Sequence, residues 1–227
     1  NRGLAIWEDL VITNLIDGRV IAFDDETGDI VWEKQVATEQ YEGFSAAPLA
    51  VSGKVIVGQA WGDWATRGWI AALDARTGDE IWRFHTVPSP DEPGGDTWVC
   101  EGTGNPDCWK SGGASAWITG SYDAESNSLI WGTGNPWPSF DPEYRPGDNL
   151  YSNSTISLDL DSGKLNWHFQ YTPGDMFDWD ETGSNLLIDT NISGMPRKTV
   201  LHFGRNGFAY SIDRENGRFI HGGQYVD

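Results

Sequence analysis

The segment 22–32 reads AFDDETGDIVW, and its pattern returns at 72–82 (ALDARTGDEIW) and at 157–167 (SLDLDSGKLNW). In each copy an aspartate precedes a tryptophan by eight residues, with Thr-Gly or Ser-Gly between them. Segment 121–131 (SYDAESNSLIW) keeps this spacing with Asn in place of Gly, and 211–220 (SIDRENGRFI) keeps only the first half. A phrase that returns at intervals of a few tens of residues is typical of repeat architectures.

The phrase has the chemistry of a β-hairpin. Alternating apolar residues predict a strand, the aspartate and the glycine supply a cap and a positive φ for the turn, and a second strand ends in the tryptophan. Further alternating stretches, such as GKVIVGQA at 53–60, lie between the copies, and no long amphipathic helix interrupts them. We therefore expect an all-β fold, a β-propeller whose tryptophans dock between neighbouring blades.

The number of copies sets the expected size of the propeller. The aspartates of the phrase stand at 24, 74, 123, 159 and 213, a spacing close to one four-stranded blade. This predicts one domain over 1–227 with four to five blades. An open arc of blades would leave sheet faces exposed, so we expect the chain to be part of a larger ring, and a complete small propeller is the alternative.

Composition narrows the class of partner. The formal net charge is −19, which opposes binding to nucleic acid and favours a cation or a basic protein. No apolar run approaches the roughly 20 residues that span a bilayer. The sequence also lacks the opening of a signal peptide, so we read the chain as an excised piece or a mature interior. We expect a periplasmic or secreted location.

The two cysteines, Cys100 and Cys108, lie in WVCEGTGNPDCW. No further ligand stands at the spacing of a zinc site. A local disulfide in an oxidising compartment is the favoured interpretation, and free thiols are the alternative.

Three further motifs, SGGASAWITGSYD (111–123), GTGNPWPSFDPEYRPGDN (132–149) and TPGDMFDWDE (172–181), follow one another along the chain. In this order, and together with the tryptophan phrase, they resemble the pyrroloquinoline quinone (PQQ) dependent alcohol dehydrogenases. This is the family of methanol and ethanol dehydrogenases, whose catalytic subunit is an eight-bladed propeller. The resemblance covers essentially all of this chain but only the first to middle part of that subunit.

The resemblance implies a set of cofactor-binding residues. Arg2, in the opening NRG, corresponds to an arginine that contacts the cofactor carboxylates, and Ser45, in FSAAP, to a threonine that touches the quinone. Ser115 and Trp117 correspond to a hydroxyl and to an indole that lies flat against the quinone, since a planar cofactor needs a rigid aromatic floor. Arg205, in FGRNG, corresponds to a basic residue near the reactive carbonyl.

The same resemblance implies metal ligands and a base. Asp63 stands where the family has a longer glutamate, and Asn135 in the second GTGNP is the expected amide ligand, whereas Asn105 in the first is a loop residue. Asp178 corresponds to the catalytic aspartate beside the cation. Asp180, two residues on, is an acid that relatives using lanthanides carry, so the set favours a lanthanide over calcium; in an extended segment both acids would share a face.

Taken with the family, these residues predict oxidation of primary alcohols to aldehydes. A cytochrome c-type electron acceptor is expected, and a homodimer is compatible with the resemblance. Two rivals remain open: a non-enzymatic propeller scaffold, such as an outer-membrane assembly factor, and carbohydrate binding or hydrolysis. For a glycosidase the two aspartates of DWD stand too close together. The four histidines have no metal-ligand spacing and are expected to be ordinary loop or strand residues: His85, His168, His202 and His221.

Overall fold

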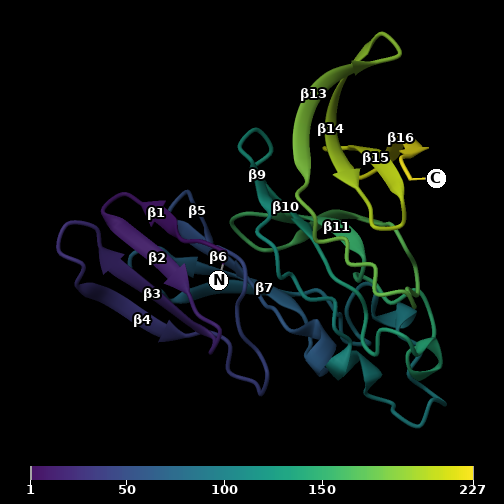
Figure 1. Ribbon diagram of the computed structural model, residues 1–227, viewed down its shortest axis with the longest axis horizontal. Coiled ribbons are helices and arrows are strands. Elements are labelled where there is room, and N and C mark those ends of the chain that lie inside the picture. Colours follow the sequence, from purple (N-terminus) through teal and green to yellow (C-terminus); the bar gives the residue numbers. More distant parts are fainter. Residues whose placement is uncertain (1, 227) are drawn as a thin grey trace.

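The computed structural model describes residues 2–226, which form four four-stranded antiparallel sheets. Each sheet is a meander of consecutive strands and is named here as a blade (Figure 1). Blade I consists of β1 (Ala5–Trp7), β2 (Leu10–Asn14), β3 (Arg19–Asp24) and β4 (Ile30–Gln35). Blade II consists of β5 (Leu49–Val51), β6 (Lys54–Gly58), β7 (Trp69–Asp74) and β8 (Glu80–His85). The all-β propeller prediction is confirmed, and the described arc has four blades.

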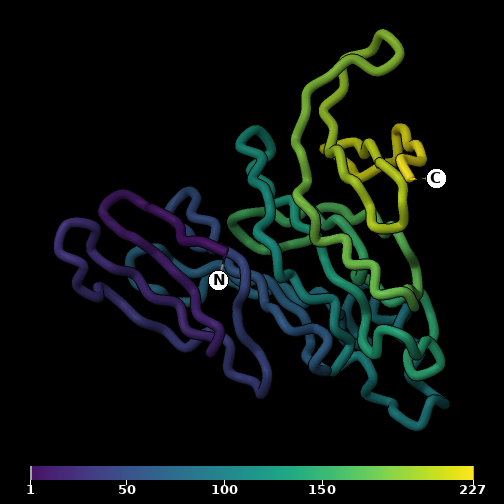
Figure 2. Tube along the Cα trace, viewed as in Figure 1, coloured from purple at the N-terminus to yellow at the C-terminus, as the bar shows by residue number. Residues whose placement is uncertain are grey.

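The second half of the chain repeats the plan with longer connections. Blade III consists of β9 (Ser121–Asp123), β10 (Ser128–Gly132), β11 (Ser154–Asp159) and β12 (Leu165–Gln170). Blade IV consists of β13 (Leu186–Ile192), β14 (Met195–Phe203), β15 (Phe208–Asp213) and β16 (Phe219–Gln224). Figure 2 shows the β13–β14 hairpin projecting from the rest of blade IV. The connections contain four short 3-10 helices: η1 (Gly62–Trp64), η2 (Gly95–Thr97), η3 (Cys108–Ser111) and η4 (Pro142–Tyr144).

The repeated phrase forms the turn between the third and fourth strands of a blade. In blade II, Asp74 Oδ1 accepts the backbone N–H groups of Arg76 at 2.8 Å and Thr77 at 2.9 Å. Gly78 then adopts φ +72°, a conformation that costs little only for glycine. A Cβ on Gly78 would also lie 2.6 Å from the Trp32 ring of blade I, so the turn glycine is where the neighbouring blade docks.

The tryptophans of the phrase connect each blade to the next. Every one is buried and donates through Nε1 to the residue after the phrase aspartate of the following blade: Trp32 to Ala75 O at 3.0 Å, Trp82 to Leu160 O at 2.9 Å, and Trp167 to Arg214 O at 3.1 Å. The predicted docking between blades is therefore confirmed at the three seams of the described arc.

Segment 121–131 is not a docking phrase. It forms the first hairpin of blade III, β9–β10, and its tryptophan, Trp131, points into the core beside Ala116 rather than onto another blade's turn. The turn chemistry is similar, since Ser126 donates to Asp123 and Asn127 takes the left-handed conformation at φ +51°. One of the segments counted as a copy of the phrase is therefore the first hairpin of a blade and not a docking hairpin.

The apolar core lies between the blades. In β6, Val55 and Val57 pack in the cluster between blades I and II, whereas Ile56 packs in the cluster between blades II and III. Likewise Leu129 of β10 packs against blade II, and Ile130 packs against blade IV. Inner blades are thus covered on both faces, which explains their continuous apolar runs.

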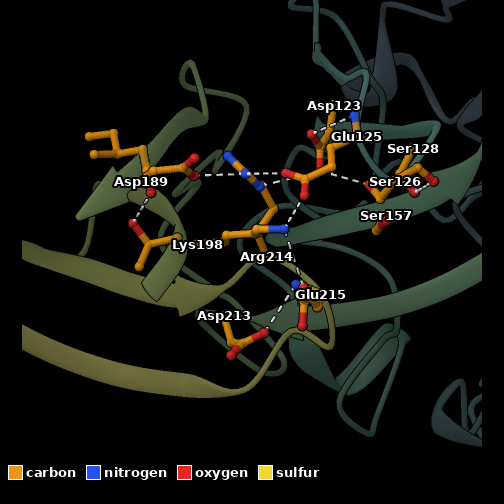
Figure 3. Close-up of polar contacts among 12 residues, drawn as sticks. Asp123, Glu125, Ser126, Ser128, Ser157, Asp189, Lys198, Asp213, Arg214 and Glu215 are labelled. Atoms are coloured by element: carbon orange, nitrogen blue, oxygen red, sulfur yellow. Dashed lines mark hydrogen bonds and ion pairs between the residues drawn. The ribbon is translucent and has the colours of Figure 1, made fainter. Parts of the chain in front are cut away.

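An ionic cluster joins blades III and IV around Arg214 (Figure 3). The guanidinium, 7% exposed, lies 3.3 Å from Asp123 Oδ2 of blade III and 2.8 Å from Asp189 Oδ1 of blade IV. Glu125 completes its surroundings at 3.7 Å and also pairs with Lys198. Arg214 also supplies the carbonyl that Trp167 uses, so this seam combines the common docking contact with a charged one.

Candidate active site

One cavity of about 300 Å³ gathers most of the predicted site residues from blades I to III and the loop before blade IV. Its lining includes seven of the residues that the sequence singled out: Arg2, Ser45, Asp63, Ser115, Trp117, Asn135 and Asp180. The two remaining predictions, Asp178 and Arg205, do not line this cavity. They lie beside it, because Arg205 Nη1 approaches Asp180 Oδ2 at 3.5 Å and the charges of Asp178 and Asp63 interact.

Trp117 lines this cavity and is held by polar contacts of its ring nitrogen and its backbone carbonyl. Its Nε1 donates to Asp180 Oδ1 at 3.2 Å, and its carbonyl accepts the hydroxyl of Ser45 at 3.1 Å. The Arg2 guanidinium lies 5.0 Å from the indole centroid and donates to Ser45 O at 3.1 Å. The indole is therefore fixed by contacts, and one face carries a cation–π partner.

Asp180 is the most strongly held acid of the site. Besides the bond from Trp117, Oδ1 accepts the backbone N–H of Asn135 at 3.1 Å. This approach requires glycine at position 134, since a Cβ there would lie 2.4 Å from Asp180 Oδ1. Burial raises the pKa of Asp180, the bonds from Trp117 and Asn135 oppose the rise, and the charges of Asp178 and Asp63 add to it.

Asp63 and Asn135 contact each other in the lining of the same cavity. Asp63 belongs to η1, which is bounded by two residues in the left-handed conformation, Trp61 and Ala65. Asn135 Nδ2 donates to Asp63 Oδ1 at 3.0 Å and to Ser139 Oγ at 2.8 Å. Because the amide nitrogen faces these acceptors, the amide oxygen is the end of Asn135 that a cation could use.

Asp178 has an unusual backbone conformation. Its φ of +64° is left-handed, so the backbone at Asp178 is not the extended segment that was expected there. The turn is held by Asp175, whose carboxylate accepts the N–H groups of Phe177 and Trp179, both at 2.9 Å. Burial, followed by the charge of Asp63, raises the pKa of Asp178, and the charge of Arg205 opposes the rise.

Whether these groups suit a metal ion depends on the donor set. Among residues 2–226 no three His, Cys, Asp or Glu side chains are already arranged as a metal site. The acids nevertheless repel one another, since the pKa of Asp178 and that of Asp180 are both raised in part by neighbouring carboxylates. Carboxylate and amide oxygens are the donors of hard cations, so this set fits such an ion.

Two buried groups behind the site were not identified from the sequence. Glu181 and His202 form a pair with 2.7 Å between Oε2 and Nε2, although His202 was expected to be an ordinary strand residue. Arg145 is fully buried and donates to Asn149 Oδ1 at 2.8 Å and to the carbonyl of Asp175. The Glu181–His202 pair and the contact of Arg145 with Asp175 join residues more than 20 positions apart, so the fold brings them together.

The remaining sequence features lie outside the cavity. Cys100 and Cys108 form the predicted disulfide, with 5.5 Å between their Cα atoms, in the long connection between β8 and β9. Asn105 of the first GTGNP donates to Tyr144 in the same region and does not line the cavity. No helix in the described part of the chain has the length and apolar character needed to cross a membrane.

Comparison with known proteins identifies the family. The family model for the PQQ-type glucose/ethanol/alcohol dehydrogenase β-propeller domain matches residues 35–224. The quinohemoprotein alcohol dehydrogenase of Comamonas testosteroni is 40% identical over 240 residues, which cover 100% of this chain and 33% of that protein. Quinoprotein alcohol dehydrogenase PedH of Pseudomonas putida is 41% identical over 241 residues, covering 100% and 40%.

Solved structures agree. A europium-containing methanol dehydrogenase gives a TM-score of 0.93 at 32% identity, covering 100% of this chain and 42% of that chain. BamB from Moraxella catarrhalis covers 98% and 48% with a TM-score of 0.55 at 16% identity, a likeness of fold alone. The chain spans 33% and 40% of the length of the Comamonas and Pseudomonas relatives, respectively. The predicted family is confirmed: the chain belongs to the PQQ-dependent glucose/ethanol/alcohol dehydrogenase β-propeller family.

Proposed function

We propose that the protein containing this chain is a quinoprotein alcohol dehydrogenase that oxidises primary alcohols to aldehydes with PQQ and a bound cation. The single observation that carries this proposal is the convergence of Trp117, Asp180, Asn135 and Asp63 in one cavity, together with the family membership. Residues 1–227 would be part of one propeller domain, since the relatives are longer.

Residues of this chain would form a binding site for a planar, anionic quinone. Trp117 offers a ring fixed at its Nε1 edge, and the hydroxyls of Ser45 and Ser115 border it. Arg2 and Arg205 contribute positive charge at two sides of Asp180 and Trp117, where the carboxylates and the reduced ring of the cofactor would need it. When bound, PQQ supplies the acceptor for the hydride of the alcohol.

We propose Asp63, Asn135, Asp178 and Asp180 as the ligands of the cation, and a lanthanide in preference to calcium. The mutual repulsion of the carboxylates supports a cation, and a trivalent ion gains more than a divalent one from each additional carboxylate. The europium in the related methanol dehydrogenase supports the same choice. Calcium remains the alternative ion.

Asp178 is the proposed general base. Its carboxylate can accept the proton of the alcohol hydroxyl, and it lies near enough to Asp63 and Arg205 for their charges to act on it. Asp175 fixes the turn on which Asp178 stands, through the N–H groups on either side of it. The stacked rings of Phe177 and Trp179, with centroids 4.6 Å apart, flank the base and offer an apolar wall for the carbon chain of the alcohol.

The same proposal includes a cellular location, an electron acceptor and an oligomeric state. We propose a periplasmic or secreted location, which suits the Cys100–Cys108 disulfide. A cytochrome c-type protein is the proposed electron acceptor, since the curated relative from Comamonas testosteroni is named a quinohemoprotein. A homodimer is compatible with this arrangement.

The test is reconstitution of the intact protein with PQQ and either lanthanum or calcium. We expect dye reduction with primary alcohols and higher activity with lanthanum. An absence of activity with both ions across an alcohol panel would contradict the enzyme assignment. Higher activity with calcium would contradict only the choice of metal.

A further inference from the structure

Glu181 points away from the cavity that its neighbour Asp180 lines. Its side chain is 0% exposed, and Oε2 lies 2.7 Å from Nε2 of His202, which is 1% exposed. This hydrogen bond joins the Glu181 carboxyl group to the imidazole of His202. The Tyr171 ring stacks on His202 with centroids 4.5 Å apart and holds the imidazole in place.

The same carboxylate supports the turn that carries Arg205. The backbone N–H of Arg205 donates to Glu181 Oε2 at 3.2 Å. Gly204 packs directly on the carboxylate, since a Cβ there would lie 3.1 Å from Oε1. The turn closes through the N–H of Gly207, which donates to Gly204 O at 3.1 Å. Glu181 therefore contacts the turn at its backbone, below the Arg205 side chain.

Two consecutive acids thus hold the two ends of Arg205. Asp180 Oδ2 faces the guanidinium at 3.5 Å, and Glu181 Oε2 accepts the backbone N–H. The Arg205 side chain is itself 56% exposed, so few contacts other than these restrict it. The orientation of the guanidinium relative to the cavity depends on where the turn is anchored.

The buried Glu181–His202 pair contributes little to the stability of the fold. Among the described residues, Glu181 Oε1 and His202 Nδ1 have no hydrogen-bond partner. Such orphaned polar atoms destabilise a fold, so apolar residues of similar volume would stabilise it more. A role of the Glu181–His202 pair in the candidate active site, rather than in packing, explains its presence here.

We propose that Glu181 is a positioning residue: its carboxylate, held by His202, fixes the turn that presents Arg205 to Asp180 and to the bound quinone. This role rests on the proposed function only in its last step, the presentation to the quinone. Glu181 touches neither substrate nor cofactor and acts through Arg205.

The first experiment needs no cofactor. Hydrogen exchange of the backbone segment 203–208 is measured by mass spectrometry in the intact wild-type protein, in Glu181→Gln and in a matched control, Tyr171→Phe. The control removes the 2.8 Å bond between Tyr171 and Thr155 but keeps the stacked ring and all contacts of Glu181. We expect exchange in this segment to rise at least about tenfold in Glu181→Gln and to stay unchanged in the control. Unchanged exchange in Glu181→Gln, or equal rises in both variants, would overturn the proposal.

The second experiment tests the link to Arg205. PQQ binding is measured by quenching of tryptophan fluorescence in Glu181→Gln, Arg205→Ala and the double variant. We expect Glu181→Gln to weaken binding by roughly tenfold or more, and the double variant to bind no worse than Arg205→Ala. Fully additive losses would overturn the positioning role. If the wild-type protein binds no PQQ, the proposed function fails, and the exchange experiment alone decides the role of Glu181.

Discussion

The seams between blades and the candidate active site are built from different kinds of sequence. At each seam one repeated phrase makes the same contact, an indole N–H to the carbonyl after the phrase aspartate. The site instead combines unrepeated segments, from Arg2 near the start of the chain to Asp180 before blade IV. The seams therefore determine stability, and changes in the site should alter binding and chemistry while the fold persists.

The strongest test of this division is Trp82→Ala at the seam between blades II and III. Trp82 is 9% exposed and donates to Leu160 O. Its removal leaves a cavity and an unpaired carbonyl, so we expect a loss of about 3–5 kcal/mol in the free energy of unfolding, measured with urea. The control is Trp64→Ala, because Trp64 is 60% exposed and should change stability by less than about 0.5 kcal/mol. Equal losses of unfolding free energy in both variants would contradict the claim that the seams determine stability.

The stability of the seam between blades III and IV should also depend on the ionic cluster around Arg214. Arg214→Met leaves the buried carboxylate of Asp123 without its cation, and we expect a loss of about 3 kcal/mol. Arg218→Met changes an exposed arginine and serves as the control. Chemical unfolding of both variants measures the difference. A loss in Arg214→Met no larger than in the control would mean that the docking tryptophan alone holds this seam.

A change in the site should leave stability nearly untouched and alter metal choice. Asp180→Ala removes one negative charge, and one carboxylate at contact distance favours a trivalent over a divalent ion by about 1 kcal/mol or more. We expect the ratio of lanthanum to calcium affinity to fall about tenfold in competition titrations. The exposed acid Glu143 supplies the control variant, Glu143→Ala. An unchanged ratio in Asp180→Ala would contradict the metal assignment while leaving the enzyme class intact.

A pH response is expected from His85, the last residue of β8. Burial, assisted by Arg67, lowers its pKa to about 4. In the unfolded chain the value is about 6.5, so protonation favours unfolding. The stability present above the unfolded pKa is lost as pH falls from there through the folded pKa.

We therefore expect the melting temperature to fall less between neutral pH and pH 4 in His85→Gln than in the wild type. The exposed His221 is the control position, and His221→Gln should retain the wild-type slope. Equal slopes in His85→Gln and the wild type would contradict the burial of His85.

The seams were predictable because their chemistry is local. An aspartate cap, a glycine with positive φ and a tryptophan at fixed spacing specify the docking hairpin within a single phrase. The same local rules also explain the error at 121–131, where a similar turn connects the first two strands of blade III. Turn chemistry identifies a hairpin but not its place in the blade.

The site was predictable only through the resemblance to a family. Nothing local brings Asp63, Asn135 and Asp180 together, because the contacts between them cross blades. The pairing of Glu181 with His202 was missed for the same reason, since 21 positions separate the two residues. The left-handed backbone of Asp178 was missed although the contacts that hold its turn, from Phe177 and Trp179 to Asp175, are local.

The measurement that tests the central claim most directly is the reduction of protein-bound PQQ by a primary alcohol in a single turnover, without an added dye. The intact wild-type protein is compared with Asp178→Asn, which keeps the shape of the base but cannot accept the hydroxyl proton. We predict that both proteins bind PQQ, that the wild type reduces it, and that Asp178→Asn does so about 10²–10⁴-fold more slowly. Equal rates of reduction in the two proteins, or no reduction in the wild type, would contradict the account.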